Sequence, residues 1–304
     1  MKNSLALIVA TKDRPGEIKK LLDSLNYQTC PPDQLIIVDG GTKLAEQVIR
    51  NYPKLNICYL RCIPPSAAKQ RNFGIKAVER KANLIGFLDD DAVLEDKSIE
   101  EMMHFWENAD DDIGGAAFNL MNSPHFNFSR LKSIALARRF GFYSNRVGAI
   151  LPSGFQTVFK NVSEITAVEW LCTGASVWRR EIFDNYQFDE WFKGYSYLED
   201  LDFSYRVGKR YKLVIVANAK FFHYPAASGR GNGEIFGRRE VVNRIYFVKK
   251  NKEMNLKKCY LAIFLRIFMN LVMGIKQLNI EYFERIKGNI EGLFEEFRKA
   301  LILR

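Results

Sequence analysis

Short apolar runs alternate with amphipathic stretches along the first part of the chain. Runs of four to eight apolar residues predict buried strands, and apolar residues spaced three and four apart predict helices. The predicted strands cover residues 5–10, 34–38, 56–60, 83–88 and 113–118, and helices are predicted to begin near Pro15, Ser66 and Ile99. Strands alternating with helices indicate an α/β protein whose mainly parallel sheet carries helices on both faces.

The fourth predicted strand ends in three consecutive acids, Asp89, Asp90 and Asp91. Three carboxylates cannot all stay ionised at a buried strand end without a counter-charge. Carboxylate oxygens suit Mg2+ or Mn2+, and ligands of open α/β sheets lie at the carboxyl ends of the strands. The triplet therefore predicts a divalent cation that holds phosphates, and the alternative is a solvated acidic turn.

The usual glycine-rich phosphate-binding signatures do not occur in the sequence. It has neither a GxGxxG dinucleotide fingerprint nor a GxxxxGK[ST] P-loop. A nucleotide bound by the first half of the chain must therefore be held another way, and the acidic triplet with a metal is the available device.

A second acidic cluster opens a predicted helix at Glu199 and Asp200, where the helix dipole favours carboxylates. A carboxylate can take the proton of an attacking hydroxyl and so act as a general base. An ordinary acidic helix start is the alternative. Asp202 and Arg206, four residues apart on one face, are predicted to form a structural pair.

Four short motifs, in order and spacing, resemble the inverting glycosyltransferases of family 2, which have the GT-A fold. They are Thr11-x-Asp13-Arg14-Pro15, Val38-Asp39-Gly40-Gly41-Thr42, Ala68-x-x-Arg71-Asn72-x-Gly74 and Phe87-Leu88-Asp89-Asp90-Asp91. The resemblance implies a Rossmann-like GT-A domain over residues 1–250, with a nucleotide-sugar-binding half at 1–118 and an acceptor-binding half at 119–250. The family has two acids after the second strand, and Gly40 replaces the second one here, which weakens inference about the donor base.

The resemblance, together with a glycine-rich loop that could close over the diphosphate through Arg230, implies a donor-binding set. The set combines residues of the first half with a small-residue turn and a glycine-rich loop of the second half. Its members are Thr11, Asp13, Arg14, Asp39, Arg71, Asp89, Asp90, Gly174 and Arg230. In an extended backbone the side chain of Asp90 points away from those of its two neighbours.

Metal and catalytic roles follow from the same resemblance. Asp91, with Asp89 and His223, would hold Mn2+ or Mg2+, although a lone histidine beside aromatic residues is otherwise a core residue. Asp200 would be the catalytic base, and Glu199 would orient the acceptor.

The implied activity is metal-dependent, inverting transfer of a hexosyl or deoxyhexosyl group from a nucleoside diphosphate donor. UDP- or dTDP-sugars are favoured, and the acceptor is a hydroxyl of a glycan or lipid-linked glycan, as in polysaccharide and cell-envelope synthesis. An inactive glycosyltransferase-like scaffold is one alternative, against which the retained Asp91 and Asp200 argue. A basic nucleic-acid-binding protein is another, and it would have no use for the two acidic motifs.

Positive charge is concentrated near the C-terminus. Residues 228–304 hold 16 Lys/Arg and 8 Asp/Glu, which accounts for most of the net charge of +10. Lysines precede an apolar segment at 259–275, which is short for a bilayer span of about 20 residues and contains Arg266 and Asn270. A basic and apolar helical extension over 251–304 is therefore expected to lie on anionic lipid, with a buried docking helix as the alternative.

The five cysteines include no CxxC pair, which fits a reducing compartment. We therefore expect a cytoplasmic protein that contacts the cytoplasmic face of the membrane peripherally. The last helix carries an apolar stripe that could pack on its own domain, on the preceding helix or on a second subunit, so a homo-oligomer stays open. No nucleic-acid partner is expected.

Overall fold

The computed structural model describes residues 3–43, 45–123, 144–226 and 232–302. They form two compact units, each described here by itself. Unit 1 takes in Met1–Pro124 and Phe159–Gly229, and unit 2 takes in His125–Val158 and Arg230–Arg304. Gly233–Lys250, which we expected in the first domain, is thus part of unit 2, while the functional halves divided at residue 118 stay a prediction.

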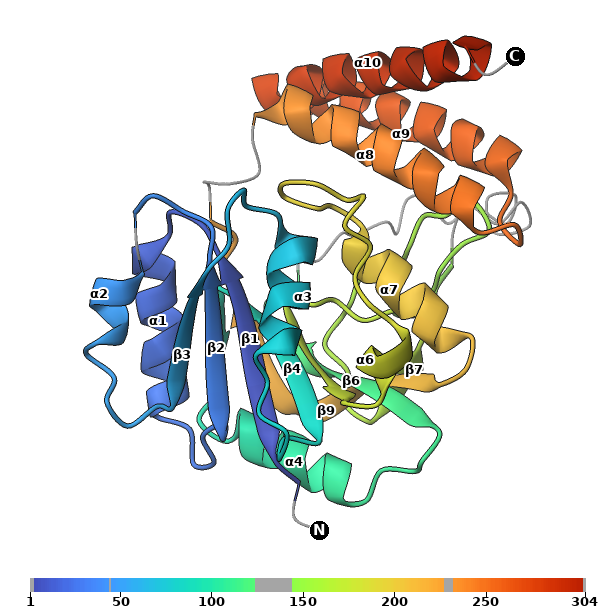
Figure 1. The fold of residues 1–304 in the computed structure, drawn as a ribbon. Coiled ribbons are helices and arrows are strands. Elements are labelled where there is room, and N and C mark those ends of the chain that lie inside the picture. The colour runs from blue at the N-terminus through green and yellow to red at the C-terminus, as the bar shows by residue number, and fades with distance from the viewer. Residues whose placement is uncertain (1–2, 44, 124–143, 227–231, 303–304) are drawn as a thin grey trace. The chain divides into compact units, whose positions relative to one another are not determined.

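Unit 1 is built on one mixed sheet (Figure 1). Its strands are β1 (Leu5–Thr11), β2 (Gln34–Asp39), β3 (Ile57–Arg61), β4 (Leu84–Asp89), β5 (Ala92–Leu94), β6 (Ile113–Leu120), β7 (Thr166–Val168), β8 (Ala175–Arg179) and β9 (Lys212–His223). The spatial order is β3-β2-β1-β4-β8-β6-β9-β5, and β7 also pairs with β9. β3, β2, β1 and β4 are parallel, whereas β8 runs antiparallel to both β4 and β6.

Helices cover both faces of this sheet, as the alternation of strands and helices predicted. They are α1 (Pro15–Asn26), α2 (Glu46–Ile49), α3 (Ala67–Lys76), α4 (Ser98–Glu107), α6 (Ile182–Asn185) and α7 (Glu199–Gly208). Leu5, Leu7 and Val9 of β1 belong to the buried core that includes the apolar residues of α1 and α4. On the opposite face α3 approaches β1 so closely that a Cβ on Gly74 would lie 2.5 Å from Ile8 Cγ2. Because successive side chains of a strand point to opposite faces of the sheet, each strand contributes apolar residues to the layers on both faces.

Strand register sets the position of polar residues at the carboxyl edge of the sheet. Thr11 pairs with Asp39, and Ala10 pairs with Asp89, so the ends of β1, β2 and β4 form one row. The antiparallel pairing of β5 with β9 places Ala92 opposite His223. The last strand thereby delivers a histidine next to the acidic triplet.

In its described residues, unit 2 has three long helices, α8 (Gly233–Lys250), α9 (Leu256–Gln277) and α10 (Ile280–Ile302). α8 and α10 pack in close backbone contact. A Cβ on Gly237 would lie 2.2 Å from the carbonyl oxygen of Arg285, and a Cβ on Gly288 would clash with the carbonyl of Glu234. Only glycine allows this approach, and ion pairs such as Arg238–Glu295 join the same two helices.

The five strands predicted at 5–10, 34–38, 56–60, 83–88 and 113–118 lie within two positions of β1, β2, β3, β4 and β6. The short elements β5, α2 and α6 were not predicted, because three or four residues carry no readable period. Residues 124–143 of the expected acceptor-binding half lie outside the described residues.

Candidate active site

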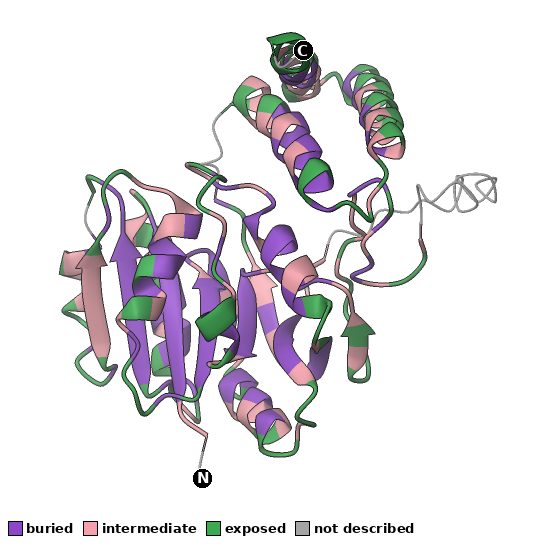
Figure 2. Cartoon of the chain, turned by 45° about the vertical axis from the view of Figure 1, so that its right-hand side comes forward, coloured by how far each residue is buried: buried purple, intermediate pink, exposed green. Residues whose placement is uncertain are grey.

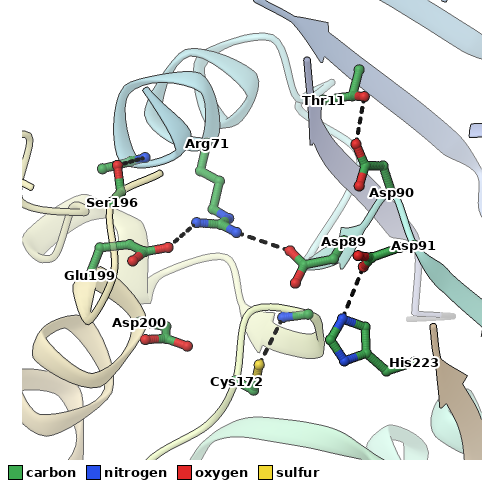
Figure 3. A network of polar contacts seen from close by, with 12 residues as sticks. Thr11, Arg71, Asp89, Asp90, Asp91, Cys172, Ser196, Glu199, Asp200 and His223 are labelled. Carbon is green, nitrogen blue, oxygen red and sulfur yellow. Dashed lines mark hydrogen bonds and ion pairs between the residues drawn. The ribbon is translucent and has the colours of Figure 1, made fainter. Parts of the chain in front are cut away.

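Asp89, Asp91 and His223 come together at the carboxyl end of β4 (Figure 3). One ligand atom from each residue lies within 4.8 Å of the other two. The pairing of β5 with β9 brings the imidazole beside the acids, and His223 Nε2 lies 3.0 Å from Asp91 Oδ1. Two carboxylates and one imidazole form a donor set that accepts Mn2+ or Mg2+, so the residues present fit a divalent cation.

Asp91 is held in place by the chain that follows β9. The backbone N–H of Ala226 donates to Asp91 Oδ2 at 2.9 Å, and the N–H of Tyr224 donates to the Asp91 carbonyl at 3.0 Å. Burial acts to raise the pKa of Asp91, but His223, Ala226 and Arg14 outweigh it and hold the pKa below its usual range. Asp91 is therefore ionised and oriented, as a metal ligand must be.

Asp90 turns away from its two neighbours, as an extended backbone predicts (Figure 3). Its carboxylate accepts hydrogen bonds from Thr11 Oγ1 at 2.7 Å and from Arg14 Nη1 at 2.8 Å. Arg14 Nη1 also lies 3.7 Å from Asp91 Oδ2. Burial raises the pKa of Asp90 to about 6. Asp90 thus fixes the end of β1 against the triplet.

Arg71 of α3 joins the triplet to the second acidic cluster. Its side chain is almost completely buried, with Nη2 3.1 Å from Asp89 Oδ1 and Nη1 hydrogen-bonded to Glu199 Oε1. The guanidinium carbon lies 5.7 Å from the centre of the Phe188 ring, which supports its plane. One arginine therefore touches both predicted halves of the site (Figure 3).

Glu199 and Asp200 begin α7 after a tightly turned segment. Ser196 and Leu198 have φ values of 55° and 80°, a left-handed conformation that is unfavourable for residues with a Cβ. Burial raises the pKa of both Glu199 and Asp200, and the nearby Arg71 opposes it. Asp200 Oδ1 accepts the N–H of Leu201 at 2.7 Å. The elevated pKa of Asp200 makes it a stronger base than an exposed aspartate.

Gly174 lies directly against Asp89. Its carbonyl accepts the N–H of Asp89 at 2.9 Å, and a Cβ at this position would lie 3.0 Å from Asp89 Oδ2. The N–H of Gly174 donates to Cys172 Sγ at 3.3 Å, and burial raises the pKa of that thiol. We did not single out Cys172 from the sequence; its position two residues before the predicted small-residue turn was the available signal.

Asp13 and Asp39 form a separate polar cluster. Asp39 is fully buried and accepts from Gly41 N at 2.7 Å, Ala45 N at 3.0 Å and Tyr59 Oη at 2.9 Å. Asp13 Oδ1 accepts the N–H of Thr42 at 2.6 Å and that of Lys43 at 2.7 Å. Both carboxylates order the loop after β2, and their expected contact with the donor stays a prediction.

The structure thus gathers most of the expected site residues around one centre. They are Thr11, Arg14, Arg71, Asp89, Asp90, Asp91, Gly174, Glu199, Asp200 and His223. Arg230, expected to contact the diphosphate, lies outside the described residues.

Comparison with known proteins gives a family and a fold. The profile of Glycosyl transferase family 2 matches residues 6–162. A search of curated protein sequences gives no match. The crystal structure of S. aureus TarS superposes with a TM-score of 0.56 at 14% identity, over 88% of this chain and 43% of that chain. This chain therefore spans less than half of the TarS chain.

Two ligand complexes are also similar. TarS 1–349 in complex with UDP has a TM-score of 0.53 at 16% identity, covering 91% of this chain and 74% of that chain. The mannosyltransferase PcManGT from Pyrobaculum calidifontis, solved with GDP-Man and Mn2+, has a TM-score of 0.58 at 10% identity, covering 97% and 88%. At these identities the likeness establishes the fold, which is a mixed sheet flanked by helices of the GT-A type.

Proposed function

This chain belongs to Glycosyl transferase family 2, and from that premise we propose that it is a metal-dependent inverting glycosyltransferase. It transfers a sugar from a nucleoside diphosphate to a hydroxyl of a glycan or lipid-linked glycan. The cluster of Asp89, Asp91 and His223, linked through buried Arg71 to a second pair of carboxylates, carries this proposal.

On the donor side, Asp89, Asp91 and His223 would hold Mn2+ or Mg2+. The bound cation supplies positive charge that stabilises the diphosphate leaving group. Arg14, 3.7 Å from Asp91, adds a fixed positive charge beside this cluster. The donor is a UDP- or dTDP-sugar, and TarS, solved with UDP, supports a uridine nucleotide. PcManGT, solved with GDP-Man, makes guanosine the competing base.

On the acceptor side, Asp200 removes the proton of the acceptor hydroxyl. The hydroxyl oxygen bonds to the anomeric carbon as the bond from that carbon to the diphosphate breaks, and the configuration inverts. Glu199, fixed by Arg71, orients the acceptor. Burial suits Asp200 to this role, because it raises the pKa of the carboxyl towards neutral pH.

Nucleotide binding tests the donor site before the acceptor is known. Titration calorimetry would compare UDP, dTDP and GDP, each with and without Mn2+, on wild type, on Asp91→Ala and on Asp111→Ala. We expect one uridine or thymidine nucleotide to bind only with Mn2+, and Asp91→Ala to weaken it by at least about 100-fold. Asp111 is an exposed carboxylate of the same unit, so its variant should bind as wild type does.

Failure of all three nucleotides to bind the folded wild-type protein would overturn the proposal. Preferential binding of GDP would support a glycosyltransferase whose donor carries guanine in place of uracil or thymine. If a nucleotide bound equally well without Mn2+ and to Asp91→Ala, the cluster of Asp89, Asp91 and His223 would not be part of the donor site.

A further inference from the structure

One face of α9 is apolar and open to solvent. Phe264, Phe268 and Ile275 expose 53%, 62% and 60% of their surface. Together with Leu261, Leu265 and Val272 they repeat at spacings of three and four, which places them on one stripe of the helix. No residue of α9 is acidic. Figure 2 shows, in contrast, that the central strands of unit 1 are mostly buried, whereas β3 and β7 are partly exposed.

The opposite face of α9 is bound to the other helices of unit 2. Arg266 Nε lies 3.3 Å from Glu240 Oε1 of α8, and Asn270 Nδ2 donates to Asn289 Oδ1 of α10 at 3.3 Å. Cys259 is fully buried on the same side. These contacts fix the orientation of α9 about its own axis. The apolar stripe therefore faces solvent when the three helices of unit 2 are packed together.

The apolar surface continues onto α10. Phe294 and Phe297 are largely exposed, and the ring of Phe297 stacks on Tyr260 of α9 at a centroid distance of 6.1 Å. Soluble monomers rarely leave a contiguous apolar patch of this kind open, so the surface calls for a partner. We name it the α9–α10 face, defined by Leu261, Phe264, Leu265, Phe268, Val272, Ile275, Phe294 and Phe297.

The charges beside the α9–α10 face indicate the chemistry of that partner. Lys252 and Lys257 are exposed just before and within the first turn of α9, and Lys276 is exposed at its end. An apolar helical stripe flanked by lysines is typical of a helix that lies at a bilayer surface rich in anionic lipid. A second copy of this chain would bring the same positive charges together, which disfavours self-association through this face.

We propose that the α9–α10 face binds the surface of an anionic lipid bilayer, with α9 lying in the interface. α9 is long and apolar enough to cross a membrane by length and composition. If α9 crossed the membrane alone, Arg266 would lose Glu240 and Asn270 would lose Asn289. If α8 and α10 entered the membrane with it, their charged faces would lie in the hydrocarbon. Both arrangements leave polar groups unpaired. The interfacial position keeps every one of these contacts.

Vesicle sedimentation of the full chain tests this proposal. The protein would be mixed with phosphatidylcholine vesicles with or without phosphatidylglycerol, without nucleotide or metal. We expect it to sediment with the anionic vesicles and to be released in part by high salt, because salt screens the lysines. The double variant Phe264→Glu/Phe268→Glu should lower binding by at least about 100-fold. Tyr27→Glu, which changes an exposed aromatic residue of unit 1, is the matched control and should bind normally.

The lysines are tested separately. Lys252→Ala/Lys257→Ala should weaken binding to anionic vesicles by roughly fivefold per lysine, whereas Lys20→Ala/Lys54→Ala, two exposed lysines of unit 1, should not. Circular dichroism would confirm that every variant is folded.

Three outcomes would overturn the proposal. Wild type could stay in the supernatant with both vesicles, or Phe264→Glu/Phe268→Glu could bind as wild type does. Light scattering could also show a dimer that this double variant dissociates, without vesicle binding, and the α9–α10 face would then join two copies. Because no substrate is present, none of these results bears on glycosyl transfer, which the nucleotide titration tests independently.

Discussion

Two buried glutamates, one in each unit and each paired with arginine, have opposite electrostatic character. Glu199 and Glu240 expose only 6% and 3% of their surface. Burial is the largest influence on both carboxyls and acts to raise their pKa. The pKa of Glu199 is raised, yet Arg285 and Arg266 outweigh burial at Glu240 and lower its pKa.

The difference lies in the balance of charge around each pair. Arg285 donates through Nε and Nη2 to Glu240, at 3.0 and 2.8 Å, and Arg266 adds a second guanidinium. Around Glu199, Arg71 is shared with Asp89 and faces Asp200 as well. The helical unit thus neutralises its buried acid, whereas the sheet unit gathers more carboxylates than guanidiniums. A buried excess of negative charge is costly unless a cation neutralises it. A metal-binding site has this excess, because the bound cation supplies the missing positive charge.

The largest effect is expected at the base. Asp200→Asn should lower the turnover of the sugar donor by about 10²–10⁴-fold, because the acceptor proton loses its base. Its melting temperature should not fall, since the change removes one of the excess negative charges. Initial rates and thermal melts would be measured together. Full activity in Asp200→Asn would show that another group is the base. The excess of carboxylates in unit 1 would then not be explained by catalysis.

A smaller effect should separate the two glutamates by stability. Glu240→Gln should cost about 1–3 kcal/mol, because it leaves two partly buried guanidiniums without their anion. Glu199→Gln should cost under about 1 kcal/mol at neutral pH, since a carboxyl whose pKa is raised to about 8 is already largely protonated there, and the uncharged amide can still accept from Arg71. Urea unfolding followed by circular dichroism would measure both. Equal losses would show that the charge balance does not distinguish the pairs.

The pH dependence should sharpen the same contrast with a more modest effect. The folded-state pKa of Glu240 is depressed, so its contribution to stability is present above the ordinary value of 4.5 and is lost as the pH falls through the folded pKa. The folded-state pKa of Glu199 is raised to about 8, so its contribution is present below 4.5 and is lost as the pH rises through about 8.

Melting temperatures of wild type and the two glutamine variants would be compared across this range. The deficit of Glu240→Gln should shrink in acid, and Glu199→Gln should gain on wild type in mild alkali. Parallel curves for all three proteins would contradict these assignments.

The sequence was most informative where apolar runs end in reactive side chains. β1, β2 and β4 were placed because each is a buried run, and parallel strands necessarily end at one edge. The antiparallel insertion of β8 between β4 and β6 was not foreseen, because an apolar run carries no direction. The sheet is accordingly mixed, although a mainly parallel one was expected.

Within the site, the sequence indicated residue types better than partners. Asp91 and His223 were paired only through the family resemblance, and their contact depends on a three-residue strand too short to predict. The bridge from Arg71 to Glu199 joins residues 128 positions apart, which no local pattern reveals. Asp39 was expected at the donor, but in the structure it is buried under Tyr59 and backbone N–H groups. Tyr59 lies on the neighbouring strand β3, and the sequence does not reveal the register in which β3 pairs with β2.

The late position of β9 in the chain has a consequence for how the protein assembles. β9 pairs with β5, β6 and β7, and of these β5 and β7 gain a hydrogen-bonded neighbour only when residues near the end of unit 1 arrive, whereas β6 already pairs with β8. β1 to β4 can associate earlier through nearer contacts, which close smaller loops at lower entropic cost. During synthesis, the parallel strands β1 to β4 of the nascent chain would therefore associate first. The proposed metal ligands Asp89 and Asp91 would meet His223 only at the end, when β9 joins the sheet.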